Sequence, residues 1–173
     1  MKKISEKSYA KAAAFFAAAF IKTPIFRTFA PNEAALARYF ESYWLGSKGI
    51  MLYEDDGIKT AFYFSETYQE GYAFDTPSVC IPEACYNIER FYRDGYAVLD
   101  MLAVAPDYRG RGLAGKAIDF FVKEAVGAGA LPLTEIFEPK HIPLYEAHGF
   151  FAAHRIQTAW GESIIMQYNG EKK

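Results

Sequence analysis

Residues 104–118 read VAPDYRGRGLAGKAI, and this stretch decides the fold because three glycine-rich patterns overlap in it. Residues 110–115 satisfy the G-x-G-x-x-G that joins a strand to a helix in dinucleotide-binding folds. Residues 110–116 satisfy the G-x-x-x-x-G-K of a P-loop. Residues 109–114 fit a third pattern, R-x-x-G-x-A. Each pattern expects a phosphate-bearing ligand, so the surrounding elements must decide among them.

Hydrophobic patterning places the stretch between two buried strands. Aliphatic residues are dense over 96–104 and again over 131–137, which predicts a strand in each place. Between them, the apolar residues of 112–126 recur on one helical face. A strand, a helix and a second strand in this order form a parallel crossover unit.

The remaining segments predict helices before this unit and strands after it. Apolar residues of 9–20 recur at helical spacing, Thr23-Pro24 ends that helix, and Asn32 caps a second one. Residues 49–54 and 59–65 flank a turn at Gly57 and predict a hairpin, whereas 78–93 favour a helix. A short helix over 143–148 and strands over 151–159 and 163–168 complete one domain spanning 1–173, without an internal repeat or a linker.

Composition argues against several partners. A net charge of -2 is not the footprint of a protein that binds nucleic acid or an anionic membrane surface. No apolar run reaches the roughly 18 residues of a membrane span, and no signal peptide is apparent, so we expect a cytoplasmic protein. Cys80 and Cys85 have no second pair, which favours free thiols and predicts no metal site.

Two of the three glycine patterns fit their surroundings poorly. A dinucleotide fingerprint sits directly on a strand end, but residues 105–109 intervene here, and the segment after 137 holds only two antiparallel strands. Glu135 stands where a ribose ligand would, which keeps a dinucleotide-binding oxidoreductase open as an alternative. The P-loop needs a Ser or Thr to hold magnesium, and Ala117 stands in that place.

The third pattern fits. The order Val104-x-Pro106-x-x-Arg109-Gly110-x-Gly112-x-Ala114, between a strand and a helix, resembles the acyl-CoA loop of the GNAT superfamily. The resemblance covers roughly the last 80 residues, because a strand and then Tyr-x-x-x-Gly-Phe at 145–150 follow. It implies an α+β fold: a mixed, mostly antiparallel central sheet with helices on both faces and one parallel strand-helix-strand crossover.

The chemistry of the loop agrees with a diphosphate ligand. Glycines let the main chain approach a ligand, and the first amides of a helix are unpaired donors with a partial positive charge. The resemblance implies acetyl-CoA as co-substrate, with no metal. It also implies the contacting residues: Leu102, Ala103 and Val104 for the pantetheine arm, Arg109, Gly110, Arg111, Gly112, Leu113 and Ala114 for the diphosphate, and Tyr145.

The reaction needs an acid and a base, and the sequence offers candidates for each. In GNAT chemistry an amine attacks the thioester directly, and the resemblance makes Tyr145 the acid for the leaving thiolate. An alkyl amine with a pKa near 10.4 must lose a proton, which costs about 5 kcal/mol at pH 7. Asp100, among apolar strand residues, is the candidate base, with a purely structural Asp as the alternative. Glu138, where many relatives carry Asn, and a water molecule are further candidates for the base.

The acceptor is the least determined part. We expect an N-acetyltransferase acting on the primary amine of a small molecule, with a non-catalytic CoA-binding sensor or interaction module as the rival, and a homodimer as a possible assembly. His141, His148 and His154 are expected to be structural or exposed. Candidate rings for an acceptor wall, or alternatively for the core, are Phe26, Phe29, Tyr39, Tyr43, Trp44, Phe74 and Trp160.

Overall fold

The computed structural model describes residues 1–69, 87–158 and 161–170. These residues form a seven-stranded sheet of order β1-β2-β3-β4-β5-β7-β6, in which only β4 and β5 are parallel. The strands are β1 (Lys2–Lys3), β2 (Met51–Asp55), β3 (Ile58–Phe64), β4 (Tyr96–Val104), β5 (Leu131–Ile136), β6 (Phe150–Thr158) and β7 (Gly161–Tyr168). The mixed, mostly antiparallel sheet with one parallel crossover confirms the predicted fold class.

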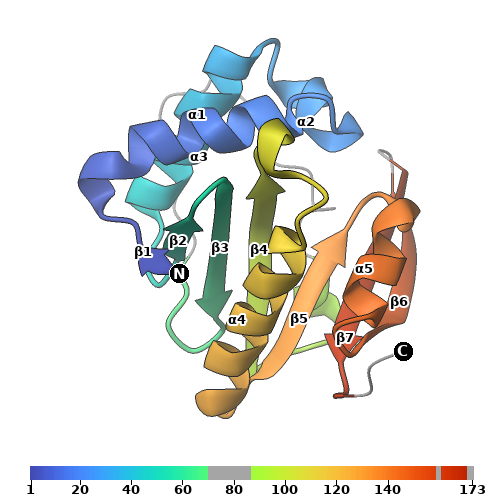
Figure 1. The fold of residues 1–173 in the computed structure, drawn as a ribbon. Coiled ribbons are helices and arrows are strands. Elements are labelled where there is room, and N and C mark those ends of the chain that lie inside the picture. Colours follow the sequence, from blue (N-terminus) through green and yellow to red (C-terminus); the bar gives the residue numbers. More distant parts are fainter. Residues whose placement is uncertain (70–86, 159–160, 171–173) are drawn as a thin grey trace.

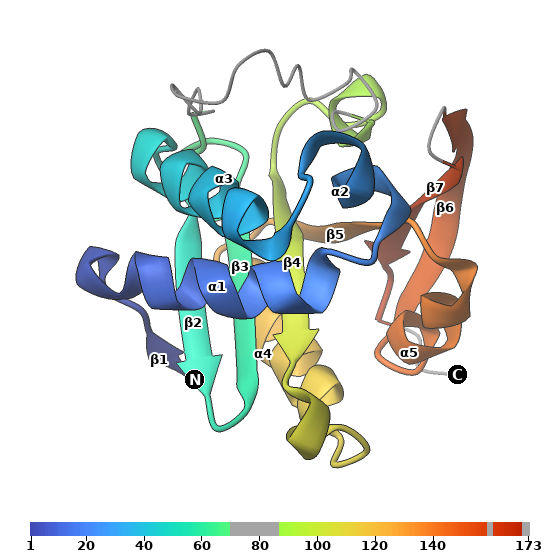
Figure 2. The same cartoon turned by 90° about the horizontal axis from the view of Figure 1, so that it is seen from above.

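Helices cover both faces of this sheet. They are α1 (Tyr9–Phe20), α2 (Pro24–Phe29), α3 (Glu33–Gly46), α4 (Leu113–Gly127) and α5 (Ile142–Glu146). Figure 2 shows α1 and α3 on one side of the strands and α4 on the other. Phe16, Phe40 and Trp44 form the core of the first layer, and Ile118 and Phe121 belong to the second. The sheet is therefore the middle of three layers, as the sequence predicted.

The first three helices can be compared with the local sequence signals for helix starts, ends and buried faces. The predicted face of α1 is buried at Tyr9, Ala12, Ala13 and Phe16. The Asn32 Oδ1 accepts the backbone N–H of Ala35 at 2.9 Å and so caps α3. Helix α2 was not predicted, because Pro24 was interpreted only as a terminator. It occupies the first turn of α2, where a missing N–H costs nothing.

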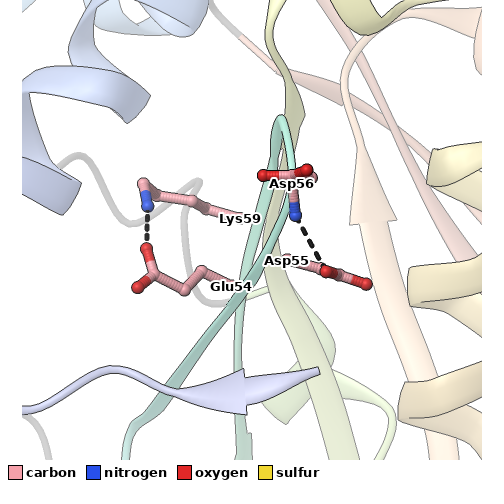
Figure 3. A network of polar contacts seen from close by, with 4 residues as sticks. All are labelled: Glu54, Asp55, Asp56 and Lys59. Carbon is pink, nitrogen blue, oxygen red and sulfur yellow. Dashed lines mark hydrogen bonds and ion pairs between the residues drawn. The ribbon is translucent and has the colours of Figure 1, made fainter.

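The β2–β3 hairpin turns at Gly57, whose φ is +70°. Figure 3 shows the side chains beside this turn: Lys59 forms an ion pair with Glu54, and the Asp56 N–H donates to the Asp55 carboxylate at 2.9 Å. The Lys59 ammonium also lies 5.3 Å from the ring centroid of Phe15 on α1. The first two contacts stabilise the hairpin itself, and the contact with Phe15 joins it to the first layer of helices.

The central strands separate halfway along their length. β4 and β5 pair from Tyr96 and Leu131 up to Leu99 and Thr134, and no further. Beyond that point the two strands diverge, as Figure 1 shows. On its other side β4 has a bulge, because Ala61 and Phe62 of β3 pair with Met101 and Leu99 and skip Asp100. Asp100 thus lies where the pairing with β5 stops.

Some elements of the structure differ from those predicted from the sequence. Residues 78–86 of the predicted helix over 78–93 lie outside the described residues, and the part from 87 on has only a 3₁₀ turn, Ile88–Arg90, and no α-helix. The short strand β1 was not predicted. β7 lies between β5 and β6 and is antiparallel to both, so the last hairpin folds back across the sheet.

Candidate active site

The loop between β4 and α4 presents its backbone amides outward. Gly110 and Gly112 have φ of +75° and +73°, a region that favours glycine. The helical bonds begin only with the Lys116 N–H, which donates to the Gly112 carbonyl at 3.2 Å. Within the described part of the chain, no protein acceptor takes the N–H groups of residues 110–114. Unpaired amides at a helix N-terminus form a site suited to an anion.

The two arginines of this loop contact its own backbone. The Arg109 Nε donates to the Val104 carbonyl at 3.3 Å, and the Arg111 guanidinium donates to the Asp107 carbonyl at 2.9 Å. Arg111 also lies 5.0 Å from the ring centroid of Tyr108. Both side chains therefore stabilise the shape of the loop, while the main chain supplies the outward donors.

The end of β4 offers an open strand edge. The Ala105 N–H donates to the Gly57 carbonyl at 2.7 Å and so points toward β3. Successive amides of a strand alternate in direction. The N–H of Ala103 therefore also faces β3, and those of Leu102 and Val104 face the side on which β5 has diverged. An extended ligand could pair with these two residues as a neighbouring strand would.

A pocket of about 140 Å³ lies where β4 and β5 separate. Phe20 and Phe26 line it from α1 and α2, and Tyr145 lines it from α5. Asp100 of β4 and Glu135 of β5 also line it. The further lining residues are Thr23, Leu99, Met101, Leu102, Thr134, Ile136, Phe137, Glu138 and His141. The structure thus brings both predicted acid–base residues, Asp100 and Tyr145, to one pocket.

Asp100 is an unusual carboxyl group. Its Oδ2 is buried and has no hydrogen-bond partner among the described residues. Burial, together with the nearby Glu135 carboxylate, raises the pKa of Asp100 to about 7. A carboxyl group with a pKa near neutrality can both take and release a proton at physiological pH.

Tyr145 is held in a largely apolar setting. The side chain is buried, with its ring 5.7 Å from the ring of Phe150 in an edge-to-face contact. Burial raises the pKa of Tyr145 to about 12, and the hydroxyl lies within hydrogen-bond reach of Thr134. The phenol therefore keeps its proton at neutral pH and can act only as a donor toward an anion.

Glu135 has buried partners that sequence reasoning missed. The Asn87 Nδ2 donates to the Glu135 Oε1 at 2.8 Å, and the Ser163 hydroxyl donates to the same oxygen. The Arg90 guanidinium donates to the Asn87 Oδ1 at 3.2 Å. Asn87 and Ser163 stand 48 and 28 residues from Glu135 in the chain, so no local pattern could reveal the cluster.

His148 and Gly115 join α5 to the start of α4. The His148 Nδ1 lies 2.8 Å from the Asp119 Oδ1, which gives this histidine an acidic partner that the sequence did not predict. A Cβ on Gly115 would lie 2.5 Å from the His148 Nε2, so the imidazole packs directly on the glycine. Tyr145 lies one helical turn before His148, so this contact fixes α5 beside the loop.

The remaining residues that the sequence singled out lie partly at the pocket, partly in the core and partly elsewhere. Glu138 lines the pocket and forms an ion pair with Lys140. Tyr39 and Trp44 are buried in the core, so Trp44 is not part of an exposed acceptor wall. His154 stacks on Phe91 with ring centroids 3.8 Å apart. Phe74, Trp160, Cys80, Cys85 and the side chain of Phe29 lie outside the described residues.

The described residues contain neither a cluster of metal ligands nor a helix that could span a membrane. No group of three or more His, Cys, Asp or Glu in the ranges given above is arranged to hold a metal ion. Within the same ranges, no helix has both the length and the apolar character that crossing a membrane requires.

Comparison with known proteins agrees with this geometry. Residues 76–151 match the model of the acetyltransferase (GNAT) domain. No curated protein sequence matches the chain significantly. Among solved structures, a histone acetyltransferase HPA2 and related acetyltransferase from Corynebacterium glutamicum is 15% identical, with a TM-score of 0.66 over 100% of this chain and 99% of that one.

Two further structures share the fold. The C-terminal condensation domain of Ebony, in complex with beta-alanyl-dopamine, is 12% identical, with a TM-score of 0.63 over 95% of each chain. A chain of the NatC complex bound to Gag peptide and CoA is 15% identical, with a TM-score of 0.55 over 97% of this chain and 98% of that one. Residues 76–151 thus match the GNAT acetyltransferase domain, and the chain shares its fold along nearly its whole length with these solved structures.

Proposed function

We propose that the chain is an N-acetyltransferase that moves the acetyl group of acetyl-CoA to the primary amine of a small molecule. The observation that carries this proposal is the pocket between β4 and β5, which Asp100 and Tyr145 both line. The GNAT domain supports acyl transfer from acetyl-CoA in general. The residues of the pocket support the finer statement about the acceptor.

The loop and the strand edge suit the co-substrate. The outward amides of residues 110–114 can hold a diphosphate, and Leu102 and Val104 can pair with the pantetheine arm. A hydrogen bond to a charged group contributes about 1.5 to 3 kcal/mol, so four or five such bonds offset the entropy lost on binding. When bound, the co-substrate supplies the thioester whose C–S bond breaks.

Asp100 and Tyr145 divide the proton chemistry. Asp100 takes a proton from the acceptor ammonium, which leaves the nitrogen lone pair free to attack the thioester carbonyl. Tyr145 donates a hydrogen bond to the sulfur as negative charge develops there. Because its pKa is about 12 and that of a thiol is about 8.5, the proton is more stable on Tyr145 than on the sulfur. The second proton, which the attacking nitrogen loses as the amide forms, passes to the departing thiolate, so Tyr145 keeps its own proton after the transition state.

A small acceptor agrees with the lining and size of the pocket. The pocket is about 140 Å³ in volume, and Phe20 and Phe26 present rings to it. Among the structural relatives, the Ebony domain is in complex with beta-alanyl-dopamine, and the NatC chain belongs to a complex bound to a peptide and CoA. The small volume of the pocket and its aromatic lining residues favour a compact amine over a peptide here.

The hydroxyl of Tyr145 provides the test. Release of free thiol from acetyl-CoA is measured with a panel of amines, alcohols and peptides. Tyr145→Phe should lower kcat at least tenfold, about 1.4 kcal/mol of transition-state stabilisation, and leave the Kd for CoA within twofold. Tyr53→Phe, which removes a hydroxyl outside the pocket, is the matched control.

Two outcomes would contradict the proposal. Tight CoA binding without turnover on any acceptor would favour a sensor or interaction module. A melting temperature that NADH raises and CoA does not would favour the dinucleotide alternative.

A further inference from the structure

Glu135 is held by a buried network whose donors all reach one of its two oxygens. Asn87 and Ser163, both fully buried, donate to Oε1. Arg90 donates to Asn87 and so adds positive charge behind the amide. Burial raises the pKa of Glu135, and the two hydrogen bonds from Asn87 and Ser163 partly offset that rise while they hold the carboxylate in one orientation. The Oε2 carries no hydrogen bond to any described residue, and Glu135 as a whole is only half-buried.

Asp100 and Glu135 face the same pocket without a cation between them. The two residues follow directly after Leu99 and Thr134, the last pair that joins β4 to β5. None of the ion pairs among the described residues involves either carboxyl group. In the sequence, residues 70–86 contain no Lys, Arg or His. Two buried like charges without a counter-ion are costly, so a cation that enters beside them would stabilise the state in which both carboxyl groups are ionised.

Two tyrosines lie near Asp100, and a third contacts both of them. The hydroxyls of Tyr43 on α3 and Tyr68 are 2.8 Å apart, and the Tyr68 ring stacks on Tyr63 of β3 with centroids 4.0 Å apart. Burial raises the pKa of Tyr43 and Tyr63, and the Asp100 charge adds to the rise in both. Ring faces and hydroxyl oxygens near an anion favour an organic cation. The titratable and charged groups of the described residues that face Asp100 or share its pocket are Tyr43, Tyr63, Tyr68, Glu135, Glu138, Lys140 through its pair with Glu138, His141 and Tyr145.

We propose that Glu135 is the anchor for the ammonium group of the acceptor, and that it makes the enzyme prefer amines whose reacting nitrogen arrives positively charged over neutral amines. This proposal rests on the acetyltransferase activity proposed above. The Glu135 Oε2 accepts one N–H of the ammonium and Asp100 accepts another. Asp100 then takes that proton and becomes a neutral carboxylic acid, while Glu135 stays ionised and keeps the neutral amine in place.

The test compares cationic and neutral acceptors in Glu135→Gln. Phenethylamine and n-butylamine are charged at pH 7.5, and aniline is not. The variant should raise the KM for both alkyl amines at least tenfold, and leave the KM for acetyl-CoA and the rate with aniline within twofold. Equal losses with aniline and the alkyl amines would overturn the anchor, because a merely structural role does not depend on acceptor charge.

Two further variants separate the anchor from general effects. Glu138→Gln removes a pocket carboxylate that already pairs with Lys140, so it should raise the KM for alkyl amines less than Glu135→Gln does. Ser163→Ala removes one donor but keeps the Glu135 charge, so it should raise that KM by a smaller factor. If Glu135→Gln fails to fold, the Ser163→Ala result decides, and an unchanged KM there would contradict the proposal.

A binding measurement distinguishes failure of the anchor from failure of the proposed activity. Calorimetry of phenethylamine and n-butylamine with the protein saturated by CoA needs no turnover. Alkylammonium binding that Glu135→Gln weakens at least tenfold supports the anchor even if no amine is acetylated. CoA binding without any alkylammonium binding to the wild-type protein overturns the anchor and leaves acetylation of uncharged acceptors open.

Discussion

At the scale of single residues, the position of Asp100 determines its chemistry. The β-bulge withdraws this residue from the ladder with β3, and the divergence of β5 leaves it at the pocket. Glu135 beside it carries like charge, and no cation among the described residues offsets the two. A carboxyl group on a regular, solvated strand would titrate near 4 and would be a weaker base at neutral pH.

The pH dependence of turnover follows from Asp100. With an alkyl amine, kcat/KM of the wild-type protein should fall below about pH 7, tenfold per pH unit, because protonated Asp100 cannot accept a proton. Asp100→Asn should lower the value at pH 8 at least tenfold and abolish that bend. Initial rates from pH 5.5 to 9 test this.

Aniline serves as the internal control, because its nitrogen already carries a free lone pair. Asp100→Asn should cost much less with aniline than with an alkyl amine. A bend near pH 7 that persists in the variant would assign the proton transfer to another group.

At the scale of elements, the sequence predicted what short-range patterns control. Periodicity found α1, α3, α4 and β4, and the glycines with Tyr145 located the loop and α5. Contacts between distant segments left no local trace: the Asn87–Glu135–Ser163 cluster and the partner of His148 became visible only in the fold. Pro24 shows a different reason, because proline both ends one helix and begins the next.

The contact between α4 and α5 predicts a sharp response at Gly115. Gly115→Ala places a methyl group against the His148 imidazole, so the ring must turn away and lose its bond to Asp119. We expect a loss of about 1–2 kcal/mol in the free energy of unfolding. Urea denaturation measures this loss. The Kd for CoA should also weaken, because residue 115 lies in the first turn of α4.

A double-mutant cycle and a second glycine of α4 provide the controls. In a His148→Ala background, Gly115→Ala should cost almost nothing, because the clash is gone. Gly127→Ala, where a Cβ meets nothing within 4 Å, should be neutral or stabilise by up to about 1 kcal/mol. Equal costs of Gly115→Ala in both backgrounds would mean that His148 does not hold α5 in place.

At the scale of the whole molecule, the site exists because the sheet is incomplete in the middle. Sequence patterning predicted β4, α4 and β5 but could not predict that the pairing would stop at Leu99 and Thr134. That point depends on the bulge opposite Ala61 and on β7 pairing along the far side of β5. Both are tertiary contacts. Because Asp100 is buried at this point, its protonation state is coupled to the stability of the whole fold.

Stability should therefore fall as pH rises from about 4 to about 7. The pKa of Asp100 is about 7 in the folded protein against an ordinary value of 3.8, so folding favours the protonated form. Stability from this group is full below its unfolded pKa and is lost as pH rises through the folded pKa, by up to about 4 kcal/mol at 1.36 kcal/mol per pH unit. Urea denaturation at pH 5 and pH 8 should show a drop in the wild-type protein that Asp100→Asn reduces. Asp94→Asn, at an exposed aspartate, should leave the drop unchanged. An equal drop in the wild type and Asp100→Asn would mean that Asp100 is ionised in the folded protein across this range, which would also remove the reason for a bend in activity near pH 7.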